Sequence, residues 1–259
     1  MYKRQDNDGD GEVGLGGVTV NLVDDGGNVV ATTTTADGTG PEALGSYLFE
    51  DVVPGDYTVV EVQPTTHLTV TDGDSTDPSD DANNASTTDN LIPVSVVSGE
   101  ADTGNDFVEE EPASISGTVT VDTDNDGDGE VGLGGVIVNL VDDGGNVVAT
   151  TTTADGTGPE ALGSYLFEDV VPGDYTVVEV QPTTHLTVTD VDSTDPSDDA
   201  SNASTTDNQI PVSVVSGEAD TGNDFVEEVQ ASISGTVTID TNNDDLGDCL
   251  LYTSPSPRD

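Results

Sequence analysis

Basic residues are almost absent from this 259-residue sequence. The only lysine and the two arginines are Lys3, Arg4 and Arg258, so the stretch from Asp6 to Asp248 contains none. That stretch carries 52 of the 53 acidic residues, since only Asp259 lies outside it. Nucleic acids and anionic membrane surfaces are themselves negatively charged, so they would be repelled by such a chain. The composition therefore excludes nucleic acid as a partner and direct membrane contact for this segment.

Cysteine and methionine occur once each, as Cys249 and Met1, and tryptophan is absent. A lone cysteine excludes an internal disulfide, and the scarcity of cysteine and histidine argues against zinc or copper. The rare residues lie at the two ends of the chain. Residues 1–5 and 249–259 look like translated sequencing adapters, and we interpret them as artefacts at the edges of an internal fragment. The alternative is a genuine basic start and a proline-rich tail.

The acidic excess raises the question of what neutralises it, because self-repulsion of this size destabilises a compact state. Bound divalent cations are one answer. Concentrated salt is another, since it shortens the screening length to about 3 Å near 1 M. Intrinsic disorder is typical of charge-rich, aromatic-poor chains. Here, however, Val, Ile, Leu, Tyr and Phe recur in short alternating runs between Gly, Pro, Asn and Asp, which indicates a folded β protein.

The sequence is internally duplicated with a period of 118 residues, because residues 6–123 match residues 124–241 at all but seven positions. This period is within the usual size of one domain. Near identity of whole copies suits a spacer better than it suits an active site. We predict a complete module at 113–230, a first copy at 6–112 that lacks its opening strand, and the start of a third copy at 231–248.

Strand signals are frequent in the complete module and helix signals are nearly absent. Residues 114–121 alternate apolar side chains and glycine with Ser and Thr, the pattern of a half-buried strand. The Asp142–Asn146 sequence supplies residues that tolerate a positive φ, as a hairpin turn requires. We predict strands at 114–121, 136–141, 147–153, 164–168, 175–180, 210–215 and 219–226. Seven short antiparallel strands favour an all-β, immunoglobulin-like sandwich of two sheets.

An acidic loop between the first two strands has the most specific local pattern. Oxygen-bearing side chains alternate along it, with a glycine after the third to permit a sharp turn, at Asp122, Asp124, Asp126, Asp128 and Glu130. A hard cation with six to eight oxygen ligands selects such a pattern, and calcium (Ca²⁺) tolerates irregular geometry better than magnesium. Leu133 occupies the place where an EF-hand has its bidentate glutamate, so a further ligand must come from elsewhere. The alternative is a solvated acidic loop.

A second acidic cluster comprises Asp190, Asp192, Asp195, Asp198 and Asp199. It lacks the regularly placed glycines of the first loop, and we place it in a long loop between strands. Long loops without secondary structure are usually functional or disordered. The cluster is either a second calcium site or a set of solvated carboxylates. Asp220 and Asp224 could complete either site or have no part in one.

No catalytic motif accompanies the single histidine of the complete module, His185. General acid–base or nucleophilic catalysis needs a partner group at a suitable spacing. The sequence has no GxSxG, no HExxH and no phosphate-binding Gly-Lys-Ser. Paired carboxylates occur throughout, but nothing singles out one pair. We predict that the chain is not an enzyme and that His185 lies in a loop or an edge strand.

Four segments together resemble a known family: SISGTVTVDTDNDG, GLGGVIVNLVDDGGNVVATTTT, YLFEDVVPGDYTVVEVQP and ADTGNDFVE. They look like the SD-repeat protein B domain, a relative of the B-type repeats of collagen-binding adhesins. The resemblance implies a transthyretin-like sandwich, calcium in the acidic loops and a stalk that projects other domains from a cell surface. It makes the five acidic residues from Asp122 to Glu130 the first-site ligands. Their counterparts in the first copy would be Asp6, Asp8, Asp10 and Glu12, where Arg4 replaces Asp122 and should weaken binding.

Some members of this family cross-link their sandwich with an isopeptide bond between a lysine and an Asn or Asp, assisted by a buried acid. Glu179 lies at a comparable place in this sequence. Because the module has no lysine, we expect Glu179 to be surface charge, with a leftover buried acid as the alternative. A bound metal is then the one strong cross-link that the composition permits.

We therefore expect a calcium-binding structural repeat of an extracellular protein, either secreted or attached to the cell wall or cell surface. Its partners would be the neighbouring modules of the same chain. Two alternatives stay open: an adhesion module that binds a matrix or cell-surface ligand, and an accessory module of a secreted carbohydrate-active enzyme. The sequences that flank this fragment in the parent protein would distinguish the three.

Overall fold

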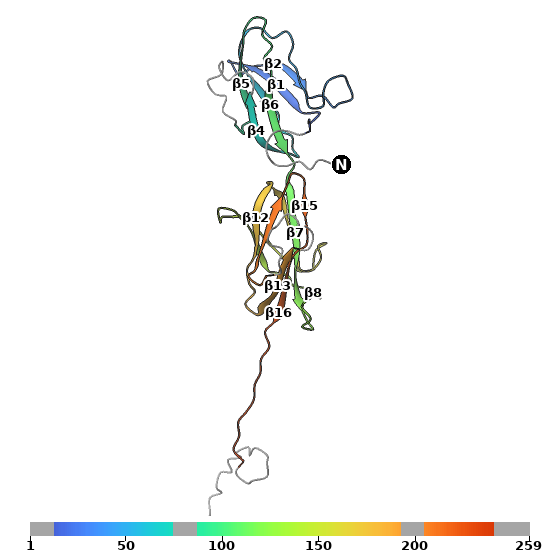
Figure 1. Ribbon diagram of the computed structural model, residues 1–259, viewed down its shortest axis with the longest axis vertical. Helices are drawn as coiled ribbons and strands as arrows, with labels where there is room; N and C mark the ends of the chain where they lie inside the picture. The colour runs from blue at the N-terminus through green and yellow to red at the C-terminus, as the bar shows by residue number, and fades with distance from the viewer. Residues whose placement is uncertain (1–12, 75–86, 193–204, 241–259) are drawn as a thin grey trace, which may run out of the picture.

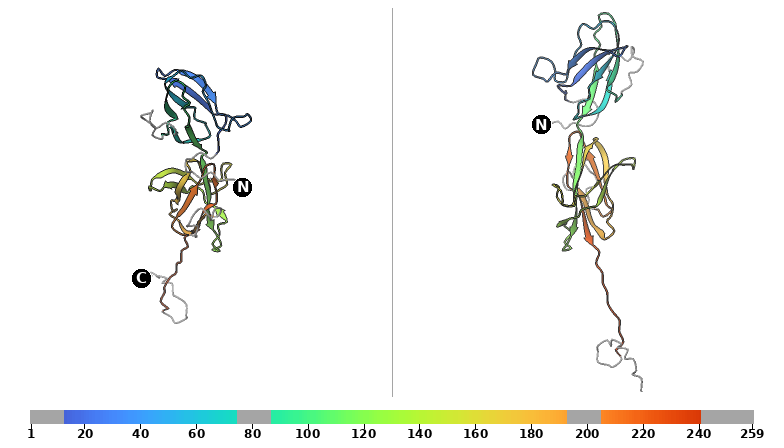
Figure 2. Two further views of the ribbon diagram at one scale, coloured as in Figure 1. Left: turned by 45° about the horizontal axis from the view of Figure 1, so that its top comes forward. Right: turned by 180° about the vertical axis from the view of Figure 1, so that it is seen from behind.

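The computed structural model describes residues 13–74, 87–192 and 205–240 and contains no helix in them (Figure 1). The described strands form two modules that follow one another along the long axis of the molecule (Figures 1 and 2). We call residues 13–110 the first module and residues 113–229 the second module. Within the described part of the chain, no helix has the length and apolar character needed to cross a membrane.

The second module is a sandwich of two sheets, which confirms the predicted all-β, immunoglobulin-like fold class. One sheet has the order β10-β9-β12-β14, and the other has the order β11-β7-β16-β13, with the short β8 and β15 paired to β7. The strands are β7 (Ala113–Asp122), β8 (Val131–Gly132), β9 (Ile137–Asp142), β10 (Val147–Thr152), β11 (Ser164–Val170), β12 (Gly173–Glu179), β13 (His185–Asp192), β14 (Gln209–Val214), β15 (Ala219–Asp220) and β16 (Asn223–Val229).

The β9–β10 hairpin shows how the local sequence sets this fold. Val138 and Leu140 point into the core from alternate positions of β9. The turn that follows is closed by Asp142, whose Oδ1 accepts a hydrogen bond from the backbone N–H of Asn146 at 2.8 Å. Gly145 adopts a φ of 79°, which residues with a Cβ adopt at a cost. The turn residues and the alternation of buried and exposed side chains thus both favour a hairpin at this place.

β7 is the central strand of its sheet. It pairs antiparallel with β11 on one side and parallel with β16 on the other, where Phe225 faces Val119. The expectation of purely antiparallel strands was therefore wrong. A parallel pair needs a long connection, and the whole module lies between β7 and β16, so the chain has ample length to return in the same direction.

Two further predictions about strands need correction. The expected strand at 219–226 is split into β15 and β16 by a turn in which Gly222 has a φ of 80°. β13 was missed, and the segment was read partly as loop because its alternating positions include acidic residues. His185 is the first residue of β13, which is an edge strand of its sheet. Of the two predicted placements, a loop or an edge strand, the second is confirmed.

The first module repeats one sheet of the second and only part of the other. β2-β1-β3-β5 form a four-stranded sheet, whereas β4 and β6 form a separate pair. The strands are β1 (Thr19–Asp24), β2 (Val29–Thr34), β3 (Gly55–Glu61), β4 (Leu68–Asp74), β5 (Leu91–Val96) and β6 (Asn105–Glu110). No described residue of this module occupies the place of β7. Residues 46–52, which match β11 in sequence, form no strand.

Among the described residues, the core of the first module is less covered than that of the second. Tyr165, Phe167 and Phe225 are buried in the second module, but the matching Tyr47, Phe49 and Phe107 are only half-buried. The three half-buried rings line a groove with a volume of about 1630 Å³. We call it the open groove.

Candidate metal centre and buried carboxylates

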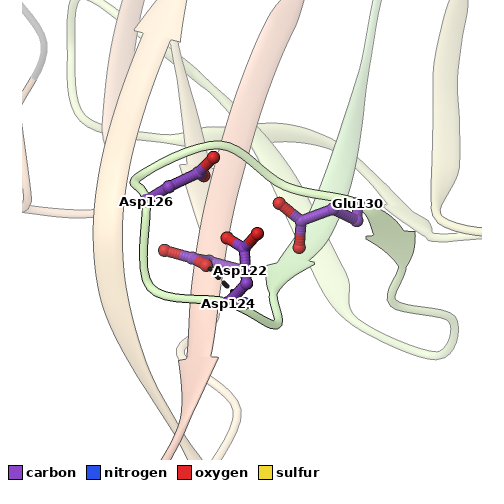
Figure 3. Close-up of side chains that lie close together, drawn as sticks. All are labelled: Asp122, Asp124, Asp126 and Glu130. Atoms are coloured by element: carbon purple, nitrogen blue, oxygen red, sulfur yellow. Dashed lines mark hydrogen bonds between the residues drawn. The ribbon is translucent and has the colours of Figure 1, made fainter.

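Four carboxylates converge in the loop that follows β7. One oxygen each of Asp122, Asp124, Asp126 and Glu130 lies within 4.8 Å of all the others. Figure 3 shows the four side chains directed into the space that the loop encloses. Asp122 is buried at the end of β7, whereas the other three are exposed. This arrangement offers oxygen ligands from several directions to one point, which is what Ca²⁺ requires.

Backbone hydrogen bonds fix the shape of this loop. Asp122 accepts from the N–H groups of Asn125 at 2.6 Å and Gly127 at 2.9 Å. Glu130 accepts from the backbone N–H of Thr123 at 2.7 Å, which brings the end of the loop back to its start. Asn125 and Gly127 have φ values of 64° and 97°, so the turn uses residue types that tolerate the left-handed region.

The electrostatics of the loop favour a bound cation. Repulsion from the neighbouring Asp126, followed by desolvation and repulsion from Glu130 and Asp122, raises the pKa of Asp124. At Asp122, desolvation opposes ionisation, but the backbone N–H groups together outweigh it and lower the pKa. The loop thus holds like charges close together, and no residue in the described part of the chain is a lysine or an arginine. A divalent cation would relieve the repulsion.

The other predicted residues of the first site are placed differently. Asp128 is outside the group of four, and its backbone N–H donates to Asp126 Oδ1 at 3.0 Å. Leu133 packs against the hydrophobic core, so it leaves the EF-hand ligand position without an oxygen side chain. The counterparts in the first copy, Asp6, Asp8, Asp10 and Glu12, lie outside the described residues.

The second predicted cluster is divided by the structure. Asp190 and Asp192 are buried residues of β13, so their placement in a long loop between strands was wrong. Asp190 Oδ2 accepts a hydrogen bond from the backbone N–H of Asn208 at 2.5 Å. Alternation along β13 turns both side chains to the inner face of the sheet, since they are two positions apart. Asp195, Asp198 and Asp199 lie outside the described residues.

Glu179, expected at the surface, is buried at the end of β12 with a 3 % exposed side chain. Neither of its carboxyl oxygens has a hydrogen-bond donor in the described structure. Its neighbour Glu227 on β16 is also buried and accepts a hydrogen bond from Gln181 Nε2. Sequence reasoning missed this pair because the two glutamates are 48 positions apart in a chain that is acidic throughout.

The environment of Glu179 and Glu227 favours a proton on one of the two carboxyl groups. Desolvation, then repulsion from Glu227 and Asp190, raises the pKa of Glu179 to about 8. Two carboxyl groups in contact cannot both ionise at low cost, so Glu179 carries the proton while Gln181 stabilises the charge on Glu227. The same cause raises the pKa of Glu61, the counterpart in the first module, to about 8. Glu179 is therefore a neutral buried acid, and its predicted role as surface charge was wrong.

Near the end of the module, an aspartate joins two strands. Asp224 Oδ1 accepts from both the backbone N–H and the hydroxyl of Thr118, each at 2.8 Å. Its carboxylate therefore fastens β16 to β7. Asp220 is buried in β15, beside β7. Neither belongs to the group of four carboxylates.

The repeat structure corresponds to a known domain family. The SdrD B-like domain profile matches residues 2–108 and again residues 113–226. The chain belongs to the SdrD B-like domain family. It is 35 % identical over 188 residues to serine-aspartate repeat-containing protein D of Staphylococcus aureus (strain Newman), which covers 68 % of this chain and 13 % of that protein. Serine-aspartate repeat-containing protein F of Staphylococcus epidermidis is 32 % identical over 178 residues, 65 % of this chain and 9 % of that protein.

The chain thus spans about a tenth of the length of these relatives. Family membership confirms the resemblance seen in the sequence and the expectation that the chain is a structural repeat, not an enzyme. Among solved structures, the Bacillus anthracis TIE protein matches with a TM-score of 0.34 and 15 % identity, covering 85 % of this chain and 32 % of that chain. The minor pilin GBS52 of Streptococcus agalactiae matches with a TM-score of 0.31 and 11 % identity, covering 87 % and 88 %.

Proposed function

We propose that this SdrD B-like domain pair is a calcium-stiffened stalk segment of an extracellular, cell-surface protein. The modules act as spacers, and Ca²⁺ bound by Asp122, Asp124, Asp126 and Glu130 holds the end of β7 and its following loop in one shape. The observation that carries the proposal is the convergence of four carboxylate oxygens within 4.8 Å of one another. A doubly charged ion there would convert repulsion into a cross-link in a module that has neither a disulfide nor a lysine.

The junction between the modules supports a spacer role. Only Glu111 and Pro112 separate β6 from β7. The backbone N–H of Glu111 donates to Ser216 Oγ at 2.8 Å, and its carbonyl accepts from Gly217 N–H at 3.0 Å. Its carboxylate faces His67 of the first module, with 3.9 Å between Oε1 and Nε2. A short linker with contacts to both modules limits their relative motion.

Calorimetric titration of the full chain with CaCl₂ in low salt tests the metal site. We expect saturable binding, and the double variant Asp124→Asn/Asp126→Asn should weaken it about tenfold or more, because two charged ligands become neutral. Asp143→Asn is the matched control, since Asp143 is exposed in the β9–β10 turn and lies outside the group of four. It should bind Ca²⁺ like the parent chain.

Two results would contradict the metal proposal. One is the absence of any calcium-dependent heat. The other is equal affinity in the double variant and in Asp143→Asn, which would place binding elsewhere. Stabilisation that appears only in molar NaCl, and not with millimolar CaCl₂, would assign the acidity to salt screening instead.

Replacing Glu111 and Pro112 together with glycine should loosen the junction. Glycine widens the accessible φ range at both positions, and the change removes the carboxylate that faces His67. We expect small-angle X-ray scattering to show a broader distribution of maximum dimensions, while the melting of each module stays unchanged. The matched control is Val229→Gly/Gln230→Gly, at the equivalent place after the second module. An unchanged distribution in the first variant would show that these two residues do not set the inter-module geometry.

The adhesion and accessory-module alternatives have no specific support in the described residues. An adhesion module needs a surface shaped for a ligand.

A further inference from the structure

β10 forms one edge of the four-stranded sheet of the second module. In the described part of the chain it pairs only with β9, so the opposite side of its backbone has no strand beside it in the sheet. On the β9 side, the backbone N–H of Thr153 donates to Val136 O at 2.9 Å. Because backbone groups alternate in direction along a strand, the N–H and C=O groups of Thr150 and Thr152 point away from β9. A row of this kind can pair with a further strand.

The other edge strands of the two sheets, β11, β13 and β14, carry features that oppose strand addition. β11 has the exposed Glu168 and Asp169, and β14 has Pro211, which lacks an N–H donor. β13 has Asp190 and Asp192, which are buried and point inward. Exposed charge, proline and inward-pointing charged residues all protect sheet edges from pairing with another chain. β10 has none of these three features.

β10 is also uncharged and partly apolar on its exposed surface. Residues 144–154 contain no charged residue, in a chain whose formal net charge is -50. Val147 and Val148 are 58 % and 52 % exposed. A bulge lies between Val147 and Ala149, but from Ala149 to Thr152 the strand pairs regularly with β9. Two acidic molecules can therefore approach each other along β10 with less repulsion than at their acidic loops.

The first module repeats this edge. Residues 26–36 have the same sequence as residues 144–154. β2 pairs only with β1 among the described strands, and Val29 and Val30 are 58 % and 51 % exposed. The chain therefore carries one such edge in each module. Weak contacts at several edges of two long molecules would act together, because the first contact raises the effective concentration for the next.

We propose that the β10 and β2 edges pair laterally with the same edges of a second copy of this chain. At β10 the pairing would be antiparallel about a twofold axis at Thr150, with Val148 of each copy opposite Thr152 of the other. Main-chain hydrogen bonds give strand addition its affinity, and Thr–Thr and Val–Thr contacts across the pair add to it. This contact goes beyond a spacer role, because it would hold neighbouring stalks side by side.

The charge pattern favours a second copy as the occupant of the edge. A basic partner would be attracted to the acidic loops and would gain nothing from an uncharged strand. A second copy offers an edge of matching length with the same neutral side chains. Asp143 and Asp155 flank the uncharged residues, and in the antiparallel pair Asp155 of one copy lies near the turn that carries Asp143 of the other. Salt screens this repulsion, so association should be stronger in about 1 M than in about 0.1 M NaCl.

The double variant Thr32→Glu/Thr150→Glu changes both edges. Thr150 is exposed, and in the proposed pair it faces Thr150 of the other copy, so the variant sets two carboxylates opposite each other. Thr58→Glu/Thr176→Glu is the charge-matched control, because Thr58 and Thr176 lie on the interior strands β3 and β12 of the same two sheets. Thermal melting of each variant checks that both modules stay folded. A second edge variant, Thr34→Pro/Thr152→Pro, removes an outward N–H from each edge without adding charge.

Sedimentation velocity of the full chain over a range of concentrations, with a chelator present, tests the proposal. The chelator prevents Ca²⁺ from bridging carboxylates, so the outcome does not depend on the metal site. We expect reversible self-association, which both edge variants weaken at least about tenfold and the control weakens less than about threefold. Amide hydrogen exchange in residues 29–35 and 147–153 should slow as the chain associates.

Three results would overturn the proposal. One is a chain that stays monomeric up to about 1 mM in about 1 M NaCl, where repulsion is screened. Another is equal weakening by the edge variants and by Thr58→Glu/Thr176→Glu, which would assign the effect to net charge. The third is association with exchange protection outside β2 and β10, which would place the contact on a different surface.

Discussion

Replacing Phe225 with alanine is expected to destabilise the second module by about 3–5 kcal/mol, the usual cost of removing a buried aromatic ring. Phe225 is fully buried in β16, and its ring centroid is 6.5 Å from that of Tyr165. β7 lies beside it in the same sheet, with Val119 as its partner. Because the surrounding core is closed on all sides, little relaxation can fill the cavity. Scanning calorimetry of the full chain should show the second-module transition at a much lower temperature.

Phe107 is the matched control, because it occupies the same place in the first module. Its ring is also 6.5 Å from its tyrosine partner, Tyr47. The difference is burial, because Phe107 is only half-buried and lines the open groove, whereas Phe225 is fully buried. Phe107→Ala should therefore cost about 1–2 kcal/mol, since less apolar area returns to water. Equal losses for the two variants would show that the groove of the first module is closed in solution, either by a strand or by collapse of its walls.

The predictable part of this fold is the part that depends on local sequence. Alternation in residues 114–121 and the turn chemistry of Asp142–Asn146 placed β7 and the β9–β10 hairpin within a residue or two. The acidic loop was predictable for the same reason. Its acidic residues are spaced two positions apart, which brings their side chains to one side of a tight turn. Four of its five predicted ligands do converge, while Asp128 does not.

What could not be predicted depends on contacts between distant segments. β13, with its buried Asp190 and Asp192, was predicted to be part of a long loop, because a carboxylate in an acidic chain gives no sign of its burial. Burial of Glu179 is non-local in the same way, because it lies on β12 beside the buried Glu227 of β16. Parallel pairing of β7 with β16 is equally non-local. Periodicity reports which face a side chain takes, but not what covers that face.

Replacing Glu179 with glutamine should stabilise the second module at pH 8 and leave it nearly unchanged at pH 5. Burial raises the pKa of Glu179 from its ordinary 4.5 to about 8. A raised pKa in the folded state means that folding favours the proton. The contribution to stability is fully present below pH 4.5 and is lost as the pH rises through about 8. Glutamine is neutral at every pH, and its amide can donate to Glu227, so the variant avoids this loss.

The expected gain is about 2–3 kcal/mol near pH 8, below the full linkage value because solvent at the sheet end screens part of the repulsion. Chemical denaturation at pH 5, 6, 7 and 8 measures it from the second-module transition. Glu168→Gln is the charge-matched control: Glu168 is exposed on β11, so its replacement changes the net charge equally without a buried partner. If both variants shift stability alike at each pH, relief of the overall acidic charge explains the gain. A pH-dependent difference confined to Glu179→Gln requires that this buried carboxyl carries its proton in the folded module.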